Sequence, residues 1–398
     1  MEFLNDLNSF FKANKLTCIY GLCILSAIFG FIPPIPQVAV YLMTILYALW
    51  VMQLRHKLNG WVLALIIYIP FNILVAAPHA LFRSWERYAF FVLLLMCVSP
   101  LFKSQKHSNK RLVIWQMLLW SCAFLGVGSF IGRFLGINCM VASQEDVLAQ
   151  VGLFGGLTPH SMMLGPVAGI GAIFMAQQAY RTQKKFYWLL MACCLVAIMF
   201  SASRSALMAS MGVLVVALYK LSGKVGKFIR LSVVAAVIAA GTFQFWGSAL
   251  DGIIKKNAGN TSAIDTSSRA SRWDSRIIEF ENSPLIGVGF SALDPKVAVG
   301  EFDAGIGVIE PGSSWLSIFS MLGLTGAFLI LGIFIRAFLR VWKTPNMHQA
   351  TLVGVLTLLF IHMVAEGYIF SAGSFLCFVL WLAVGMAYEA KLLPKNIQ

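Results

Sequence analysis

Long apolar runs, separated by short polar segments, make up most of this chain. Each run is close to the roughly 20 residues that a helix needs to cross a bilayer. Backbone N–H and C=O groups find no partners in lipid, so runs of this kind are expected to be helical. We predict about twelve spanning helices, at residues 16–33, 36–53, 60–80, 87–102, 112–134, 159–179, 186–202, 205–220, 229–247, 314–335, 350–370 and 373–390.

One polar stretch, residues 248–313, separates the ninth predicted span from the tenth. It is too long for a simple connector, and its Trp, Ile and Phe residues argue against disorder. The chain is therefore predicted to be an all-α polytopic membrane protein. Residues 1–247 would carry nine spans, residues 248–313 a large helical loop on the outer side, and residues 314–398 three spans and a cytoplasmic tail.

The composition agrees with this prediction, because 59% of the residues are hydrophobic, 12% are charged and the mean hydropathy is +0.81. These values exclude an ordinary soluble domain. With the N-terminus in the cytoplasm, most of the 30 Lys and Arg residues fall in cytoplasmic segments, which predicts that both termini are cytoplasmic. The net charge of +14 is thus a topology signal and does not indicate nucleic acid.

Acidic residues gather in the outer segments, so mixed charge, and the chemistry that needs it, is expected on the outer side. The eight cysteines give no disulfide or metal-ligand spacing, and no glycine-rich phosphate loop precedes a helix. We expect neither a metal nor a cofactor.

Residues 266–284 have the pattern of one amphipathic helix, with N-cap residues at 266–268 and the stop signal Asn-Ser-Pro at 282–284. Three arginines fall at i, i+3 and i+7 on one face: Arg269, Arg272 and Arg276. Three apolar residues fall on a neighbouring face: Trp273, Ile277 and Phe280. Such a helix can lie on a bilayer surface and offer guanidinium groups to phosphate. The alternative is a surface helix whose arginines are only solvated.

Arg204 lies in a tight turn between two apolar runs, at the outer ends of the seventh and eighth predicted spans. A charge near membrane depth is costly and usually faces a cavity or the protein interior. The alternative is an arginine that extends its side chain to the interface.

Three residues are candidates for a proton acceptor. His160 opens the sixth span beside Pro159 and would act as a base or as a helix cap. Glu366 lies near the outer end of the eleventh span, where a carboxylate needs a partner such as Arg204; an ion pair and a catalytic role both fit. Glu310 ends the long loop and is a base or a solvated carboxylate.

Four segments carry sequence motifs in a fixed order. Residues 154–165 resemble Gly-Leu-x-x-His-x-x-x-Leu-Gly, residues 203–206 Ser-Arg-(Gly/Ser)-Ala, residues 268–289 Gly/Ser-Arg-x-x-x-Trp followed by Pro-(Leu/Ile)-x-Gly-x-Gly, and residues 313–326 the return into the membrane. Together, over residues 150–380, they resemble the O-antigen ligase/polymerase family of bacterial surface-polysaccharide enzymes.

This resemblance implies a metal-independent, inverting type C glycosyltransferase of the bacterial inner membrane. It implies as partners the lipid bilayer, an oligosaccharide linked to undecaprenyl diphosphate, and a glycan acceptor, and it allows a chain-length regulator. Arg204 and Arg269 match the family's diphosphate-binding arginines, with Arg272 and Arg276 beside them. Such arginines stabilise the leaving diphosphate without a metal, and a base deprotonates the acceptor.

One departure bears on the choice of function. Ligases of this family carry a His-Asn pair just before the return span, and this chain has Gly312 and Ser313 at those positions. The leading hypothesis is therefore an O-antigen or exopolysaccharide polymerase. The alternatives are a ligase acting on lipid A core, or a transporter or assembly component for lipid-linked glycans. A transporter would carry charges in several mid-membrane segments and show internal symmetry, and we find neither pattern.

Overall fold

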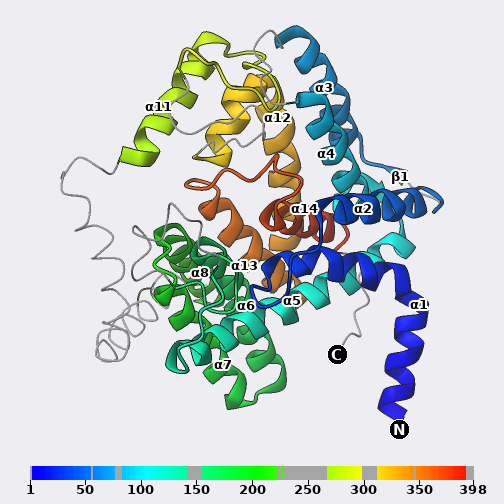
Figure 1. The fold of residues 1–398 in the computed structure, drawn as a ribbon, viewed down its shortest axis with the longest axis vertical. Coiled ribbons are helices and arrows are strands. Elements are labelled where there is room, and N and C mark those ends of the chain that lie inside the picture. The colour runs from blue at the N-terminus through cyan, green and yellow to red at the C-terminus, as the bar shows by residue number, and fades with distance from the viewer. Residues whose placement is uncertain are drawn as a thin grey trace.

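The structure, a computed structural model, describes residues 2–54, 57–76, 83–140, 154–222, 226, 229, 267–297, 312–343 and 347–390. These residues are mostly helical (Figure 1). The helices are α1 (Glu2–Leu25), η1 (Ser26–Ile28), α2 (Gln37–Met52), α3 (Gly60–Ala76), α4 (Ser84–Val98), α5 (Gln105–Phe134), α6 (Ser161–Thr182), α7 (Lys185–Phe200), α8 (Arg204–Ser222), α11 (Ser267–Asn282), α12 (Ser314–Trp342), α13 (Met347–His362) and α14 (Phe375–Tyr388). Two short strands, β1 (Lys57–Leu58) and β2 (Phe102–Lys103), pair antiparallel.

Three of the described helices, α5, α6 and α12, are long and apolar enough to cross a membrane. Shorter apolar helices lie at most of the other predicted spans, which confirms a helical membrane protein. The predicted ninth span falls almost wholly outside the described residues, so the total of about twelve stays a prediction. The predicted helix at 350–370 is too long, because α13 ends at His362 and the chain turns before α14.

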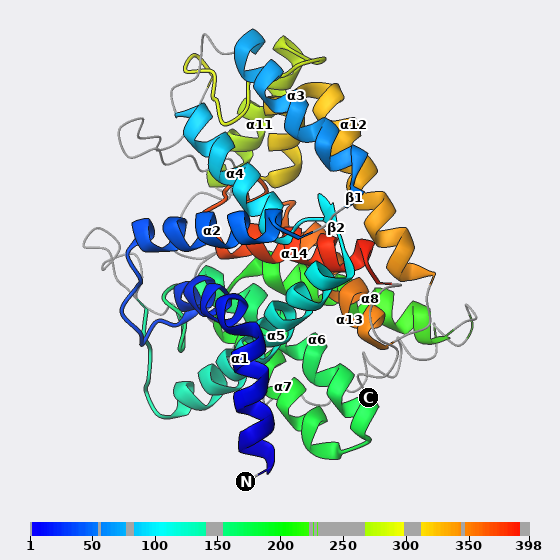
Figure 2. The ribbon, with the colours of Figure 1, turned by 90° about the vertical axis from the view of Figure 1, so that its right-hand side faces the viewer.

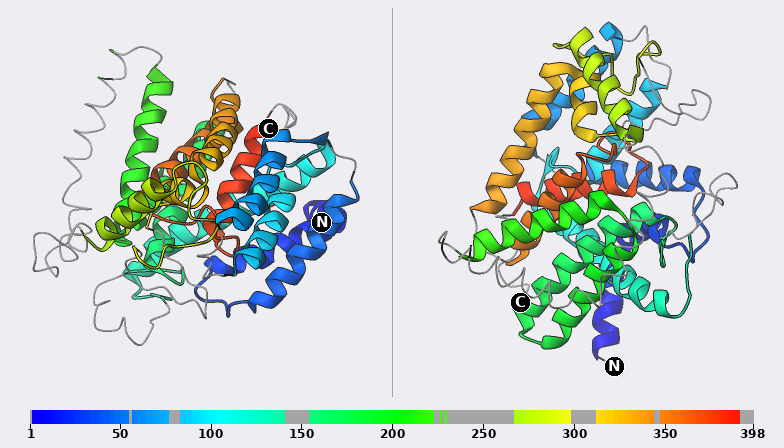
Figure 3. Two further views of the ribbon diagram at one scale, coloured as in Figure 1. Left: turned by 90° about the horizontal axis from the view of Figure 1, so that it is seen from above. Right: turned by 90° about the vertical axis from the view of Figure 1, so that its left-hand side faces the viewer.

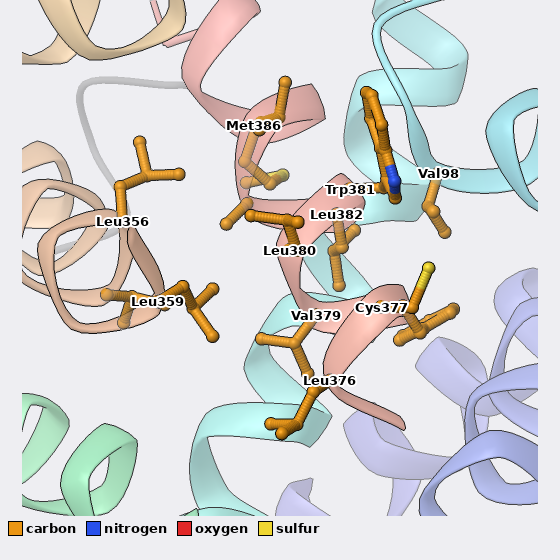
Figure 4. Close-up of a cluster of buried hydrophobic side chains, with 14 of the residues drawn as sticks. Val98, Leu356, Leu359, Leu376, Cys377, Val379, Leu380, Trp381, Leu382 and Met386 are labelled. Atoms are coloured by element: carbon orange, nitrogen blue, oxygen red, sulfur yellow. The ribbon is translucent and has the colours of Figure 1, made fainter. Parts of the chain in front are cut away.

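The core of the molecule is built around α14. Every residue of this helix is buried, and it packs against α4, α5, α12 and α13 (Figure 1). Figure 4 shows side chains of α14 meeting Leu356 and Leu359 of α13 on one side and Val98 of α4 on the other. Gly385 allows the close approach to α4, because a Cβ there would clash with the Val98 carbonyl oxygen.

Two groups of helices flank this core. α5, α6, α7, α8 and α13 pack together, and α3 and α11 pack on α12. Figures 1 and 2 show the first group in the lower half of the molecule and the second in the upper half, with α14 between them. The views in Figure 3 show the same arrangement from above and from the opposite side. The segment between α13 and α14 therefore lies where the two groups meet.

The cytoplasmic basic residues predicted from sequence include one that is buried. The Arg111 guanidinium of α5 lies 2.7 Å from the Glu389 carboxylate, at the end of α14, and donates to the Phe102 carbonyl at 2.8 Å. A buried charge requires such partners, and removing one of them costs about 3–5 kcal/mol. This contact fixes α5 against the C-terminal end of α14.

The segment that follows α11 holds that helix against α12. α12 is broken at Gly323, which has φ +62 and ψ −167, so carbonyls before the break need partners outside the helix. The contacts that supply them are Val288 N to Ser320 O (2.8 Å), Gly289 N to Met321 O (3.1 Å) and the Tyr68 hydroxyl to Leu322 O (2.8 Å). Gly287 is required because a Cβ there would lie 2.5 Å from the Met321 carbonyl carbon.

Asn72 of α3 completes this junction. Its amide nitrogen donates to Ile286 O at 2.7 Å, and its amide oxygen accepts from Phe290 N at 2.6 Å. A single buried amide thus satisfies both a donor and an acceptor of the same loop. The glycine-rich motif at 284–289 therefore has a structural function, which is to seat α11 on the broken helix α12.

Candidate functional site

The turn between α7 and α8 places Arg204 at the first position of α8. Ala202 has φ +50, and the Ser201 hydroxyl donates to Ile198 O at 2.6 Å, which closes the hairpin. Ser203 accepts from Ala206 N at 3.4 Å and thereby caps the helix. The Arg204 side chain is exposed. The predicted tight turn is confirmed, and it places Arg204 at the end of the α7–α8 helix pair.

α6 packs closely on this turn. A Cβ at Gly165 would lie 2.6 Å from Ala206 Cβ and 3.0 Å from Ser203 Cβ, so glycine is needed for the approach. His160 is the N-cap of α6, and its Nδ1 accepts from Met162 N at 3.1 Å. The structure therefore confirms the predicted capping role of His160 and places this exposed residue on the same side of the helix group as Arg204.

Glu366 reaches the same turn from the segment between α13 and α14. Its carboxylate lies 3.5 Å from the Ser205 hydroxyl, next to Arg204 along the chain. Its backbone carbonyl accepts from the Ser314 hydroxyl at 2.6 Å and from Ser314 N at 3.0 Å. The carboxylate is half-buried. Glu366 is therefore positioned by its main chain, which leaves its side chain facing the α7–α8 turn.

Ser314 connects this segment to the start of α12. Its hydroxyl also accepts from Tyr368 N at 2.9 Å, and Ser313 caps α12 by accepting from Leu316 N. The carbonyl of Gly312, directly before the cap, accepts from the Trp273 indole N–H of α11 at 3.1 Å. A series of short contacts thus leads from Ser205 through Glu366 and Ser314 to α11.

α11 forms at the residues that the cap and stop signals predict. Arg272 is half-buried, and its side chain lies against Gly312. Phe280 packs on Phe319 of α12 with ring centroids 5.7 Å apart, while Ile277 is 43% exposed. The side chain of Arg269 and the whole of Glu310 lie outside the described residues.

The expectation of a continuous exposed row of arginines is wrong at Arg276. This residue is buried, and its guanidinium lies 2.8 Å from the Glu279 carboxylate, which is also buried. Glu279 accepts in addition from Asp294 N at 2.9 Å. Burial raises the pKa of Glu279 above its ordinary value, more than the neighbouring Arg276 lowers it, and burial also lowers the pKa of Arg276. The face that carries Arg276 packs inward because α11 packs against α12.

Several of these segments also match a known protein family in sequence. Residues 189–331 match the model of the family described as O-antigen ligase. In this segment the chain is similar to the O-antigen ligase family. No curated protein gives a match to the chain. The predicted family is thus confirmed, and it indicates a glycosyl-transferring integral membrane protein of surface-polysaccharide biosynthesis.

The segment that matches the O-antigen ligase family is shorter than the predicted 150–380. It contains most of α7, all of α8 and α11 and most of α12, and therefore Arg204 and the three arginines of α11. His160 and Glu366 lie outside it. The tertiary structure, and not the match, brings Glu366 to the α7–α8 turn.

Sequence reasoning missed Arg87, near the start of α4. Its guanidinium donates to the Ser291 hydroxyl at 3.1 Å and borders a small cavity that also reaches Gly367, the residue after Glu366. An arginine directly before an apolar run is the signal that singled out Arg204, and Arg87 shows the same signal before residues 88–98. Within the described part of the chain, no group of three His, Cys, Asp or Glu residues gathers to hold a metal ion.

Proposed function

We propose that this protein is a polysaccharide polymerase that transfers a glycan from undecaprenyl diphosphate to an acceptor hydroxyl at the periplasmic face of the bacterial inner membrane. Both chain termini would lie in the cytoplasm. The distribution of basic residues supports this orientation, because most Lys and Arg residues then fall in cytoplasmic segments. In this orientation Arg204, the arginines of α11 and Arg87 would lie on the outer side.

The observation that carries the proposal is the contact between the Glu366 carboxylate and the Ser205 hydroxyl, beside Arg204. It puts a proton acceptor at the turn of a helix pair, against the residue that follows Arg204 in the chain. From Glu366 the contacts continue through Ser314 to Gly312, which lies against Arg272. A negatively charged leaving group between these arginines would therefore lie close to a carboxylate.

In the proposed reaction, the acceptor hydroxyl oxygen forms a bond to the anomeric carbon as the bond from that carbon to the diphosphate oxygen breaks. The electron pair leaves with the diphosphate, and Glu366 takes the hydroxyl proton. Attack opposite the leaving group inverts the anomeric configuration. Arg204 and Arg272, with Arg269, would stabilise the departing diphosphate, so the step needs no metal.

Glu366 is the preferred base among the three candidates. His160 uses its Nδ1 to cap α6, and Glu310 lies outside the described residues. We assign Arg276 a structural role rather than diphosphate binding, because it is buried against Glu279.

A ligase is the second candidate, and the description of the matched family favours it. The residue at the position of the ligase histidine argues against a ligase, because Gly312 has no side chain that accepts a proton. The polymerase therefore remains the first choice.

Substitution of Arg204 tests the proposal. Purified protein in lipid nanodiscs, given lipid-linked repeat units, should elongate them, and R204A should lower the rate by about 100-fold or more, with R204K between the two. R133A is the matched control. Arg133 also lies at the outer end of its helix, but its guanidinium stacks on the rings of Phe154 and Phe200, so this variant should keep the activity. Full elongation by R204A, or wild-type transfer to lipid A core alone, would refute the proposed function.

A further inference from the structure

Arg87 stands at one wall of a polar cavity that the proposed reaction does not use. The cavity has a volume of about 30 Å³, and three serines are among the residues that border it, Ser291, Ser317 and Ser371. Arg87 is half-buried, and its bond to Ser291 joins residues 204 positions apart in the chain. A space of this size holds about two water-sized groups. It therefore suits oxygen atoms of a phosphoryl group and is too small for a sugar ring.

This cavity lies on another side of the Glu366 segment from Arg204. Gly367 and Ser371 border the cavity, whereas Glu366 itself faces Ser205. Figures 1 and 2 place α4 and α8 on different sides of the segment between α13 and α14. Arg87 and the turn that carries Arg204 thus meet the same segment from different helices.

An apolar groove begins beside the cavity. It has a volume of about 150 Å³ and is bordered by α1, α2, α4 and the start of α14, including Val40, Phe90, Leu94 and Phe378. A cavity of this volume lined by Leu, Ile and Phe side chains takes up benzene, so the groove has room for a group of about the size of an isoprene unit.

One segment of the chain borders both spaces. Residues 369–371 border the cavity, and residues 372–375 border the groove. On α4, Phe90 lies one helical turn after Arg87 and stacks on Tyr41, with ring centroids 4.0 Å apart. Tyr41 borders the groove as well. A cationic side chain at the cavity and an apolar groove along the same segment match a polyprenyl diphosphate.

We propose that Arg87 and this groove bind the diphosphate and the first isoprene unit of the acceptor's lipid carrier. The inference rests on the proposed polymerase function. A polymerase joins two carrier-linked glycans and must hold two diphosphates at once, whereas a ligase holds one carrier and a different acceptor. The arginines at the α7–α8 turn and on α11 serve the donor, and Arg87 serves the acceptor.

The test compares two acceptors with one donor in the full-length protein in nanodiscs. The donor is a carrier-linked repeat unit whose acceptor hydroxyl is blocked. One acceptor is the repeat unit on polyprenyl diphosphate, and the other is the same repeat unit on a neutral phenyl aglycone. The tested variant is R87Q, because the Gln amide removes the charge and keeps a polar side chain with hydrogen-bond donors at this position.

We expect R87Q to raise KM for the carrier-linked acceptor by about 10- to 100-fold, as for loss of a charged hydrogen bond. KM for the donor and the rate with the phenyl acceptor should not change. R83A is the matched control, because Arg83 lies four positions earlier, is exposed and meets Glu86 at the surface. Equal effects of R87Q on both acceptors, or an effect on the donor, would overturn the inference.

Binding of undecaprenyl diphosphate alone separates this inference from the proposed function. Native mass spectrometry should detect two molecules per wild-type chain, and one in either R87Q or R204A. A wild type that binds one molecule and still polymerises refutes the Arg87 site and leaves the polymerase intact. A wild type that transfers to no carrier-linked acceptor refutes the proposed function and the inference with it.

Discussion

Gly312 lies directly against Arg272 of α11. A Cβ at position 312 would lie 3.1 Å from Arg272 Cβ, and Gly312 has φ +71, a conformation that other residues adopt only with strain. The carbonyl of Gly312 is held by the Trp273 indole at 3.1 Å. The chain therefore has glycine where the resemblance predicts histidine because the backbone here approaches α11 in a left-handed conformation.

The first prediction is that G312H neither creates a ligase nor leaves the fold unperturbed. The left-handed backbone should cost about 1–3 kcal/mol, and crowding against Arg272 should add to it. The measurement is thermal unfolding in detergent together with transfer to lipid A core. The control is G136H, because Gly136 has φ +70 in open space and tests the strain without the crowding. Equal unfolding temperatures for the two variants would show that Arg272 does not constrain position 312.

The second prediction concerns the proposed base. E366Q should lower the transfer rate by about 10²- to 10⁴-fold, because the amide cannot take the acceptor's proton. The fold should persist, because the contacts of Glu366 with Ser314 use its backbone carbonyl. Steady-state transfer rates and unfolding temperatures measure both effects. A fully active E366Q would exclude Glu366 as the base.

His160 provides the comparison for that experiment. H160N should keep α6 capped, because Asn is a good N-cap residue, and should keep most of the activity. If H160N instead loses activity as far as E366Q is expected to, the base is His160 and the assignment of Glu366 fails.

The third prediction distinguishes a structural role of Arg276 from a role in diphosphate binding. E279A leaves the buried guanidinium without its carboxylate and should destabilise the protein by about 3–5 kcal/mol. The double variant R276M/E279Q removes both charges, and Gln can still accept from Asp294 N, so it should unfold near the wild-type temperature. It should also retain transfer activity. If the double variant is stable but inactive, Arg276 is instead assigned to diphosphate binding.

The fourth prediction is the pH dependence of this pair. Burial raises the pKa of Glu279 in the folded protein, so its carboxyl holds the proton more firmly when folded than when unfolded. The contribution of Glu279 to the free energy of unfolding is therefore fully present below the unfolded pKa of about 4.3. This contribution is lost as the pH rises through the higher pKa of the folded state. Gln resembles the protonated form at every pH.

The unfolding temperature of E279Q relative to wild type should therefore increase as the pH rises from about 4 to 7. Thermal unfolding at several pH values measures this difference, and E281Q serves as the control because Glu281 is exposed on the same helix. A relative unfolding temperature that falls with rising pH would mean that attraction to Arg276 outweighs the cost of burying the carboxylate.

Much of the site can be predicted locally. The cap residues and the stop signal place α11 correctly, and the serine-arginine turn places Arg204 at the start of α8. The helical membrane class follows from the apolar runs. These features depend on residues within a few positions of each other, which is why periodicity and turn chemistry are sufficient to find them.

Contacts between residues that are far apart in the sequence cannot be predicted in this way. Ser205 and Glu366 are 161 positions apart, and Arg87 and Ser291 are 204 apart. Spacing along a helix shows that Arg269, Arg272 and Arg276 are neighbours, but the packing of α11 on the broken helix α12 buries Arg276 and leaves Arg272 beside Gly312. The chain's own pattern thus determines a helical membrane protein with arginines at its outer ends. The close packing of distant helices decides which of those charges share a site, because burial and pairing depend on neighbours that no local pattern encodes.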